Sequence, residues 1–393
     1  MSDRMTASPA ASSTTATRLP YPHACPADGD PFAPRHGRGR GDDRIEGGEG
    51  ETAVLLMAYG GPASLDEVPA YYTDIRGGRP PSPELLAELL ERYTAIGGRS
   101  PLAEVTERQR RALEAELARR GLGLPVFVGY KHSSPFVAET VDRMAAAGVR
   151  RVLAIALAPH FSTMTACSYC QRVDAARAAL PARDGGPVLR YVMVADWHAE
   201  PAFVDALADV TRAALAEAEA AAAGERTAAG EGTAAGEGTA AGEGTAAGEG
   251  TAAGEPATGA PWVVFTAHSL PERIVGVGDP YPELLRETAR LVAETLGWRR
   301  WSFAFQSAGR TGEAWLGPDL RSELERLAGS GSRAVVVAPV GFVASNLELL
   351  YDIDIEAQAR AAELGLTLVR AAALDDHPGL VAALADIVER AME

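Results

Sequence analysis

The sequence predicts an α/β protein built from two doubly wound domains that face each other across a cleft. Eight short apolar runs, rich in β-branched residues and closed by loop residues, are typical of strands. Most are separated by stretches in which apolar residues recur every three or four positions, and strands alternating with helices favour parallel sheets with right-handed crossovers. The runs lie near residues 53–58, 125–130, 151–158, 188–195, 261–267, 301–305, 333–340 and 367–372.

The strands form two groups of four, and we set the boundary between the groups near residue 187. The first α/β domain is then expected at residues 51–187 and the second at 188–374. A helix is expected at 375–393 and would pack on either domain. Both domains are long enough to bury a core of their own.

Two segments of low complexity lie outside this pattern. Residues 1–50 are rich in Ala, Ser, Thr, Gly and Pro, then in charge, and are expected to be a disordered leader. The sequence TAAGE occurs five times at a six-residue period between Thr227 and Glu255. The largest apolar side chains in the repeat are those of Ala and Thr, whereas a β-helix stacks larger apolar residues at regular positions. We therefore expect a flexible insertion at 221–258 in the second domain.

The overall composition excludes several classes of partner. The net charge of −16 argues against nucleic acid or an anionic membrane as the main partner, because both need a clustered positive surface. No apolar run approaches the roughly 18 residues of a transmembrane helix. Three cysteines in 393 residues fit a reducing cytoplasm better than a disulfide-stapled secreted fold, so we expect a cytoplasmic protein.

A histidine and a glutamate follow two of the predicted strands. His268 ends the run at 261–267, and Glu348 lies in the loop after the run at 333–340. Ligands of parallel α/β sheets bind at the carboxyl ends of strands, where an imidazole and a carboxylate can hold a divalent cation such as ferrous iron or move protons. Taken alone, however, His268 could equally cap a helix or bond a carbonyl group.

Two further acids continue from Glu348 at intervals of four residues. Asp352 and Glu356 would lie on the same helix face as Glu348, about 6 Å apart per step. Such a row suits a path for cations. A solvated acidic surface or a strand-like alternation remain the alternatives.

Basic and aromatic residues gather after the first predicted strand. Tyr59 ends that strand, and Arg76, Arg79 and Arg92 follow in DIRGGRPPSP and ERYTAIGGRSPL. Guanidinium groups bind carboxylates through paired hydrogen bonds, so several near one cleft would suit an acid-bearing substrate. Scattered surface arginines are the alternative reading.

These segments together resemble the ferrochelatase family. The likeness runs from Val54 to the end, interrupted by the repeats, through MAYGGP, YYTDIRGGRPPSPE, RYTAIGGRSPL, LAPHFS, TAHSLPE, GDPYPE, QSAGRTGEAWLGPDL and PVGFVASNLELLYD. It implies two Rossmann-like, chelatase-type domains, each with a four-stranded parallel sheet flanked by helices. It also implies insertion of Fe²⁺, as substrate, into a porphyrin without an organic cofactor.

The resemblance assigns roles to individual positions. His268 and Glu348 match the catalytic metal-site pair, and Asp352 and Glu356 become candidates for a delivery path. Tyr59 matches the tyrosine that is an axial iron ligand in the Gram-positive branch, whereas protoporphyrin-using relatives usually have Met or Leu there. The remaining porphyrin-contacting positions are matched by Arg76, Arg92, Tyr93, Ser100 and Tyr169.

Tyr59 therefore implies coproporphyrin III as the substrate and iron-coproporphyrin III, or coproheme, a haem precursor, as the product. A downstream enzyme of the haem pathway is then a candidate partner. Alternatives are a protoporphyrin IX ferrochelatase, a chelatase that uses cobalt or nickel with another tetrapyrrole, and a non-catalytic porphyrin or haem carrier. Retention of both His268 and Glu348 argues against the carrier.

The chain departs from the family pattern in two places. Many relatives have Asp-His where this chain has Ser345-Asn346, so the roles of that acid and imidazole are not carried over. Some relatives bind a [2Fe-2S] cluster through four cysteines, but no cysteine follows Cys170 here, so we expect no cluster. Cys167 and Cys170 are expected to be buried or idle thiols, and His132 and His160 to be cleft or packing residues.

Overall fold

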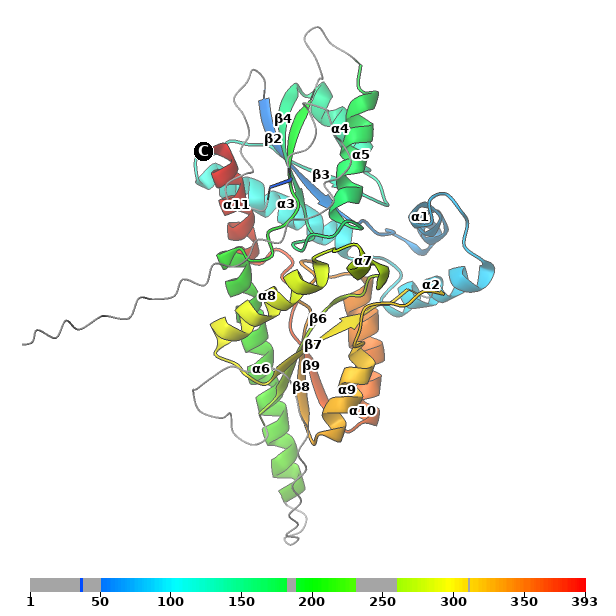
Figure 1. Cartoon of the computed structure of the whole chain (residues 1–393), viewed down its shortest axis with the longest axis vertical. Helices are drawn as coiled ribbons and strands as arrows, with labels where there is room; N and C mark the ends of the chain where they lie inside the picture. The colour runs from blue at the N-terminus through cyan, green and yellow to red at the C-terminus, as the bar shows by residue number, and fades with distance from the viewer. Residues whose placement is uncertain (1–35, 38–50, 182–188, 231–259, 310–311) are drawn as a thin grey trace, which may run out of the picture.

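The computed structural model describes residues 36–37, 51–181, 189–230, 260–309 and 312–393, and it shows two sheets, one in each lobe of an elongated molecule (Figure 1). The first sheet has the strand order β1-β5-β4-β2-β3, and the second has the order β7-β6-β8-β9. Every neighbouring pair of strands is parallel. The predicted α/β fold with two parallel sheets is confirmed.

The strands are β1 (His36–Gly37), β2 (Glu51–Ala58), β3 (Val126–Tyr130), β4 (Val149–Ala156), β5 (Arg190–Val194), β6 (Trp262–His268), β7 (Trp301–Gln306), β8 (Ala334–Ala338) and β9 (Thr367–Arg370). The helices of the first lobe are η1 (Leu65–Glu67), α1 (Val68–Ile75), α2 (Pro83–Ala95), α3 (Leu102–Arg119), α4 (Val137–Ala146) and α5 (Ala166–Ala179). Those that follow are α6 (Pro201–Gly230), α7 (Arg273–Gly276), α8 (Tyr281–Leu296), α9 (Leu320–Gly329), the π-helix η2 (Glu348–Ala357), α10 (Gln358–Glu363) and α11 (Pro378–Met392).

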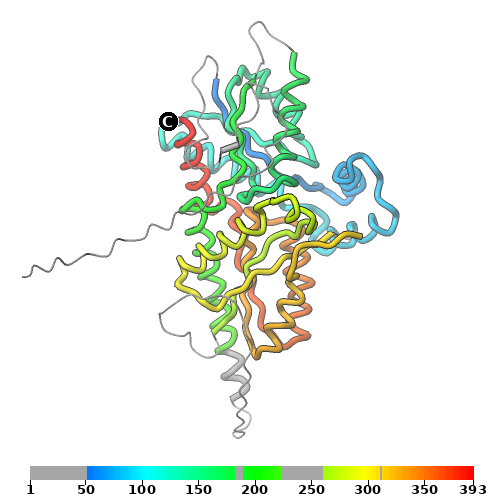
Figure 2. The backbone as a smooth tube through the Cα atoms, viewed as in Figure 1, coloured from blue at the N-terminus to red at the C-terminus, as the bar shows by residue number. Residues whose placement is uncertain are grey.

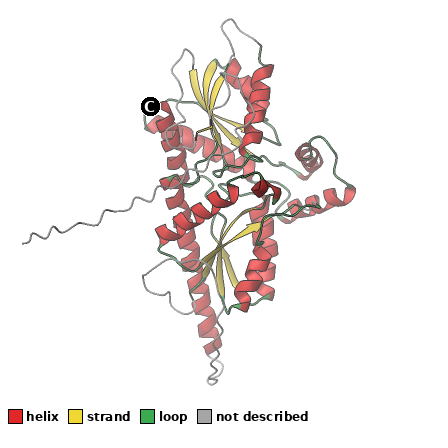
Figure 3. Ribbon diagram, in the orientation of Figure 1, coloured by secondary structure: helices red, strands yellow, loops and turns green. Residues whose placement is uncertain are grey.

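Helices cover both faces of each sheet (Figure 3). The interior strand β2, between β4 and β3, is buried on both sides, and Ala53 to Met57 have no exposed surface. In the first lobe α3 packs on one face, and α4 and α5 pack on the other. Continuous apolar runs such as Ala53–Met57 are what a parallel sheet buried on both faces requires, because alternate residues point to opposite sides.

The C-terminal helix joins the two lobes. In Figure 2 it lies at the end of the chain beside α6, and it packs against both α3 of the first lobe and α6. Leu113 of α3, Leu207 of α6 and Leu384 of α11 belong to one buried cluster that reaches both sheets. The lobes therefore share a continuous apolar core along one side of the molecule.

The boundary expected near residue 187 is wrong. Strand β5 pairs along its length with β4, as in Val192 beside Leu153, so the first sheet continues to Val194. The expected insertion also begins too early, because α6 continues to Gly230; residues 231–258 lie outside the described part. Alanine is the best helix former, so the Ala-rich start of that tract extends a helix already nucleated by tertiary packing.

The expected leader contains one described element. Residues His36–Gly37 form β1, which pairs with Met193 and Val194 at the edge of the first sheet. The first sheet therefore has five strands rather than the four expected, although β1 has only two residues. The other residues of the expected leader lie outside the described part. Among the residues that the structure describes, every helix is too short or too polar to span a lipid bilayer.

A second connection between the lobes is polar. Asp279, which precedes α8, is 4% exposed and accepts hydrogen bonds from the loop after β4. The Ser162 hydroxyl donates at 3.0 Å, the Thr163 amide at 2.7 Å and the Thr163 hydroxyl at 2.6 Å, all to Asp279 Oδ2. One carboxylate oxygen thus fixes the end of a first-lobe strand against the second lobe.

Replacing Asp279 by alanine should lower the free energy of unfolding by about 3 kcal/mol, because it leaves buried donors without an acceptor. Asp209→Ala is the control, since Asp209 is 59% exposed and pairs only with Arg212 on α6; it should change stability by less than about 0.5 kcal/mol. Chemical denaturation measures both variants. Equal stabilities would show that the Asp279 contacts do not hold the lobes together.

Candidate functional site

A cavity of about 340 Å³ lies where the two lobes meet. Residues from the first lobe and from the second line it, at the carboxyl ends of β2, β3, β4, β6 and β8. Six of the ten residues that the sequence assigns to the site are on its wall, namely Tyr59, Tyr93, Ser100, Tyr169, His268 and Glu348. The tertiary structure therefore brings together most of the predicted site.

His268 is the last residue of β6 and is fixed by its neighbours. Its Nδ1 lies 2.5 Å from the carbonyl oxygen of Ser269, a contact in which the ring nitrogen donates. The Tyr281 hydroxyl donates to the His268 carbonyl at 3.0 Å. In the tautomer that carries its proton on Nδ1, Nε2 has a lone pair that can bind a metal or accept a proton.

Glu348 is the first residue of η2. The side-chain oxygen of Asn346 accepts a hydrogen bond from the Leu349 amide at 3.0 Å, which caps the helix start, and Gln306 Nε2 donates to the Glu348 carbonyl at 3.4 Å. The loop before it packs closely on β6. A Cβ at Gly341 would lie 2.9 Å from the Ala267 Cα, so only glycine lets this loop approach the strand that carries His268.

Three tyrosines share the cavity wall with Glu348. Burial raises the pKa of Tyr59, Tyr71 and Tyr93 well above the ordinary value, and the negative charge of Glu348 raises each further. Tyr59 is nevertheless 41% exposed, so one side of its ring faces open space. The cavity thus presents a carboxylate among neutral phenols, a set that can bind a cation and accept protons.

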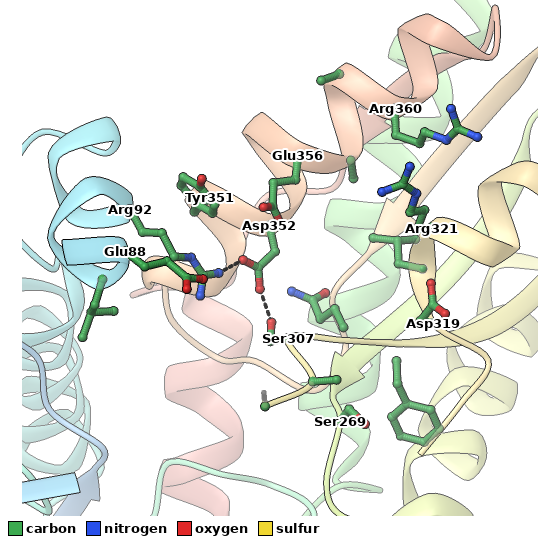
Figure 4. Close-up of a pocket in the computed structure, with 18 of the residues that line it drawn as sticks. Glu88, Arg92, Ser269, Ser307, Asp319, Arg321, Tyr351, Asp352, Glu356 and Arg360 are labelled. Carbon is green, nitrogen blue, oxygen red and sulfur yellow. Dashed lines mark hydrogen bonds and ion pairs between the residues drawn. The ribbon is translucent and has the colours of Figure 1, made fainter. Parts of the chain in front are cut away.

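The acidic row from Glu348 does not stay in one cavity. Asp352 and Glu356 line a second, outer cleft of about 830 Å³ (Figure 4). Asp352 is 8% exposed and is bound on one oxygen by Arg92 and on the other by the Ser307 hydroxyl. The expectation of three acids lining a single α-helical face is corrected, because η2 is a π-helix and the three carboxylates are divided between two spaces.

Arg92 also differs from its expected place. Its guanidinium contacts Asp352, and it lies over the Tyr351 ring with 4.7 Å from Cζ to the ring centroid. It lines the outer cleft, whereas its neighbour Tyr93 lines the inner cavity. Arg76 caps the end of α1, 5.8 Å from the Tyr72 ring centroid, and is on the wall of neither space.

Ser345 and Asn346, which stand where many relatives have Asp-His, form hydrogen bonds with other parts of the chain. The Ser345 amide donates to Asp375 Oδ1 at 2.7 Å, and the Ser345 hydroxyl donates to Asp375 Oδ2 at 3.1 Å. Asn346 lines the cavity while it caps η2. Neither supplies an acid or an imidazole beside Glu348.

The other two singled-out histidines are held by polar partners. His160 lines the cavity, but it is 2% exposed, its Nε2 lies 2.8 Å from the Thr288 hydroxyl, and burial lowers its pKa well below the ordinary value. His132 Nδ1 lies 2.6 Å from Asp74 Oδ2, and burial lowers its pKa to about 4. Both are packing residues at the site, as expected.

The two cysteines of α5 differ from each other. Cys170 is a buried thiol whose pKa burial raises to about 12, as expected of an idle group. Cys167 is disulfide-bonded, so its expected state as an idle thiol is wrong. Among the described residues, no three metal-binding side chains lie close enough to form a metal centre by themselves.

Two cavity residues were missed in the sequence. Tyr71 donates a hydrogen bond to the Gly60 carbonyl at 3.3 Å and lies 6.4 Å, ring to ring, from Tyr93. Lys131 follows β3 and lines the cavity between Tyr59 and Tyr169. A signal for Lys131 was available, because it is the only lysine of the 393 residues.

Comparison with known proteins identifies the family. The family model named ferrochelatase matches residues 51–228 and 247–392. The ferrochelatase of Deinococcus radiodurans is 38% identical over 86% of this chain and 95% of its own, and the coproporphyrin III ferrochelatase of a Geobacillus strain is 37% identical over 86% and 97%. The ferrochelatase of Thermus thermophilus is 40% identical over 86% and 98%.

A solved structure with more distant likeness is SirB from Bacillus subtilis with Fe³⁺, at a TM-score of 0.47 and 10% identity over 87% of this chain and 95% of that one. The match to the family model covers both lobes, and the relatives align with nearly their whole length. The chain belongs to the ferrochelatase family.

Proposed function

We propose that this protein inserts Fe²⁺ into coproporphyrin III to form coproheme, and that the inner cavity is its active site. The observation that carries the proposal is the meeting of His268, Glu348 and Tyr59 on the wall of one cavity between the lobes. Relatives named coproporphyrin III ferrochelatase, at 36–38% identity, support the choice of porphyrin.

Insertion of Fe²⁺ into the free porphyrin replaces two pyrrole N–H protons, which must be accepted by other groups. His268, with Nδ1 held by the Ser269 carbonyl, would bind iron or take up a proton at Nε2. Glu348 would attract the incoming cation and accept a proton. Tyr59 would face the ring as an axial ligand, and Tyr93, Ser100 and Tyr169 would contact the porphyrin.

The outer cleft would serve iron rather than porphyrin. Asp352 and Glu356 line it, so we propose a route for the metal along η2 from the cleft to Glu348. Asp352 also forms an ion pair with Arg92, which the incoming metal would have to replace. Arg76 and Arg92 would anchor propionates only if their side chains leave their present partners. We further propose that the enzyme acts in the cytoplasm, although the disulfide at Cys167 is uncommon in a reducing compartment. We also propose that it needs no organic cofactor or [2Fe-2S] cluster and hands coproheme to a later haem-pathway enzyme.

The substrate is tested by an anaerobic spectrophotometric assay with Fe²⁺ and either coproporphyrin III or protoporphyrin IX. We expect kcat/KM at least tenfold higher for coproporphyrin III. A preference for protoporphyrin IX would replace the proposed substrate by the alternative one. Absence of metal insertion into either porphyrin, together with retained porphyrin binding, would favour a carrier.

The repeat tract should be dispensable for this activity. The family model matches both lobes but not residues 229–246, so the segment lies outside the part of the chain that defines the family. A chain that lacks 229–246 is expected to keep kcat/KM within about twofold and its melting temperature within a few degrees, because loop length changes loop-closure entropy only slowly. The same assay and a thermal melt check this, and a tenfold loss of activity would assign the tract a role.

A further inference from the structure

The single lysine of this chain lies in the active-site cavity. Of 37 basic residues, 36 are arginine, and the exception is Lys131, immediately after β3. Arginine and lysine are not equivalent in a confined site, because the guanidinium is broad, planar and always charged, whereas the ammonium is compact and changes its pKa readily. The cavity therefore contains a compact cation at Lys131, whereas the other 36 basic residues are arginines.

The surroundings of Lys131 leave its charge without a counterion. The ammonium lies 5.7 Å from the ring centroid of Tyr59 and 5.9 Å from that of Tyr169, within the range of cation–π attraction to both rings. Asp74, the acid whose charge acts on Lys131, is occupied by His132 at 2.6 Å and Arg172 at 3.8 Å. Across the described ranges, no carboxylate lies within ion-pair distance of Lys131.

Burial changes the pKa of the Lys131 ammonium. Burial of the side chain and, to a smaller extent, the positive charge of Arg172 lower the pKa of Lys131 from its ordinary value to about 8, and the charge of Asp74 partly opposes both. The ammonium is thus still mainly protonated at neutral pH, although it has lost water and gained no anion. A substrate carboxylate would supply the missing countercharge.

We propose that Lys131 binds a carboxylate of the porphyrin on the Tyr59 and Tyr169 side of the cavity and thereby selects coproporphyrin III over protoporphyrin IX. This inference rests on the proposed function. Coproporphyrin III carries four propionates, two of them at positions where protoporphyrin IX carries vinyl groups. Lys131 discriminates between the two porphyrins when the carboxylate that it binds is one of the two that replace vinyl groups.

The first test measures porphyrin binding in the absence of iron. Lys131→Met keeps the length of the side chain and removes the charge; Lys131→Arg keeps a charge. We expect Lys131→Met to raise the Kd for coproporphyrin III about 10–100-fold and the Kd for protoporphyrin IX less than about threefold. Lys131→Arg should recover part of the loss. The matched control is Arg111→Met, which removes a cation from a side chain that is 70% exposed on α3.

The second test uses the uniqueness of the lysine. Reductive methylation with ¹³C-formaldehyde labels only Lys131 and the α-amino group and preserves the charge, and the Lys131→Arg variant identifies which NMR signal is the lysine. The signal should titrate with a pKa near 8 in the free protein and with a higher pKa when coproporphyrin III is bound. The sign follows from binding to the protonated form: affinity is full below about pH 8 and declines above it.

The outcomes of these tests distinguish the proposed function from the proposed role of Lys131. If the wild type does not prefer coproporphyrin III, the proposed function fails. Suppose that the wild type prefers coproporphyrin III. If Lys131→Met then keeps that preference, or loses affinity for both porphyrins equally, the role of Lys131 as a selective residue is overturned while the proposed function stands. An NMR pKa unchanged by coproporphyrin III would also overturn it.

Discussion

Replacement of His268 by alanine is expected to lower the rate of iron insertion by about 10²–10⁴-fold while porphyrin affinity changes less than about threefold. The imidazole supplies the Nε2 lone pair at the wall of the cavity, and the hydrogen bond from Nδ1 to the Ser269 carbonyl sets its orientation. Its removal takes away a metal ligand or proton acceptor but little of the contact area. Anaerobic steady-state kinetics and a porphyrin titration without iron measure the two quantities.

A second histidine provides the control for this experiment. His377 caps α11, where its Nδ1 accepts a hydrogen bond from the Gly379 amide at 3.1 Å, and it is not on the cavity wall. His377→Asn keeps a capping acceptor and should retain full activity. Turnover within about twofold of the wild type in His268→Ala would remove His268 from the reaction.

Glu348→Gln is expected to reduce kcat by about 10²-fold or more, with a larger effect at low Fe²⁺ concentration. The amide has the same shape but neither attracts a cation as strongly nor accepts a proton, and no second acid stands at the Ser345-Asn346 position to compensate. Loss of the charge should also lower the pKa values of Tyr59, Tyr71 and Tyr93, which Glu348 now raises. Kinetics over a range of Fe²⁺ concentrations separate attraction of the metal from proton removal.

The control for Glu348 is Glu104→Gln, at a residue that is 64% exposed and contacts only Arg99 at 3.4 Å. It removes one negative charge from an exposed side chain of α3 that is not itself on the cavity wall, so it should leave kcat and the Fe²⁺ dependence unchanged. If both variants lose activity to the same extent, the effect belongs to net charge. If neither does, Glu348 has no part in the chemistry.

The meeting of His268 and Glu348 on one cavity wall was predictable from sequence because parallel sheets impose a simple rule. His268 ends β6 and Glu348 follows β8, and these two strands are neighbours in the second sheet. The carboxyl ends of neighbouring parallel strands lie at one edge, so two loops that carry polar residues must meet there. No knowledge of side-chain packing was needed for that step.

The positions of Asp352 and Glu356 relative to Glu348 were not predictable from sequence in the same way. Intervals of four residues predict one face of a helix, but they do not show which wall that face meets. Arg92 and Asp352 are 260 positions apart in the sequence, and their contact depends on how α2 packs beside η2. The division of Glu348 from Asp352 between two cavities was therefore decided by tertiary packing.

The sequence by itself determined the α/β class, the positions of the long strands and the placement of His268 and Glu348 at strand ends, because hydrophobic periodicity and strand ends are local properties. The family followed from the likeness of its ordered motifs and not from periodicity. Tertiary structure alone decided that β5 completes the first sheet, that Arg92 is bound by Asp352, and that Lys131 stands between two tyrosines without a counterion. Those outcomes depend on which distant segments come into contact. Charge and burial at a site follow from that contact and not from any single segment.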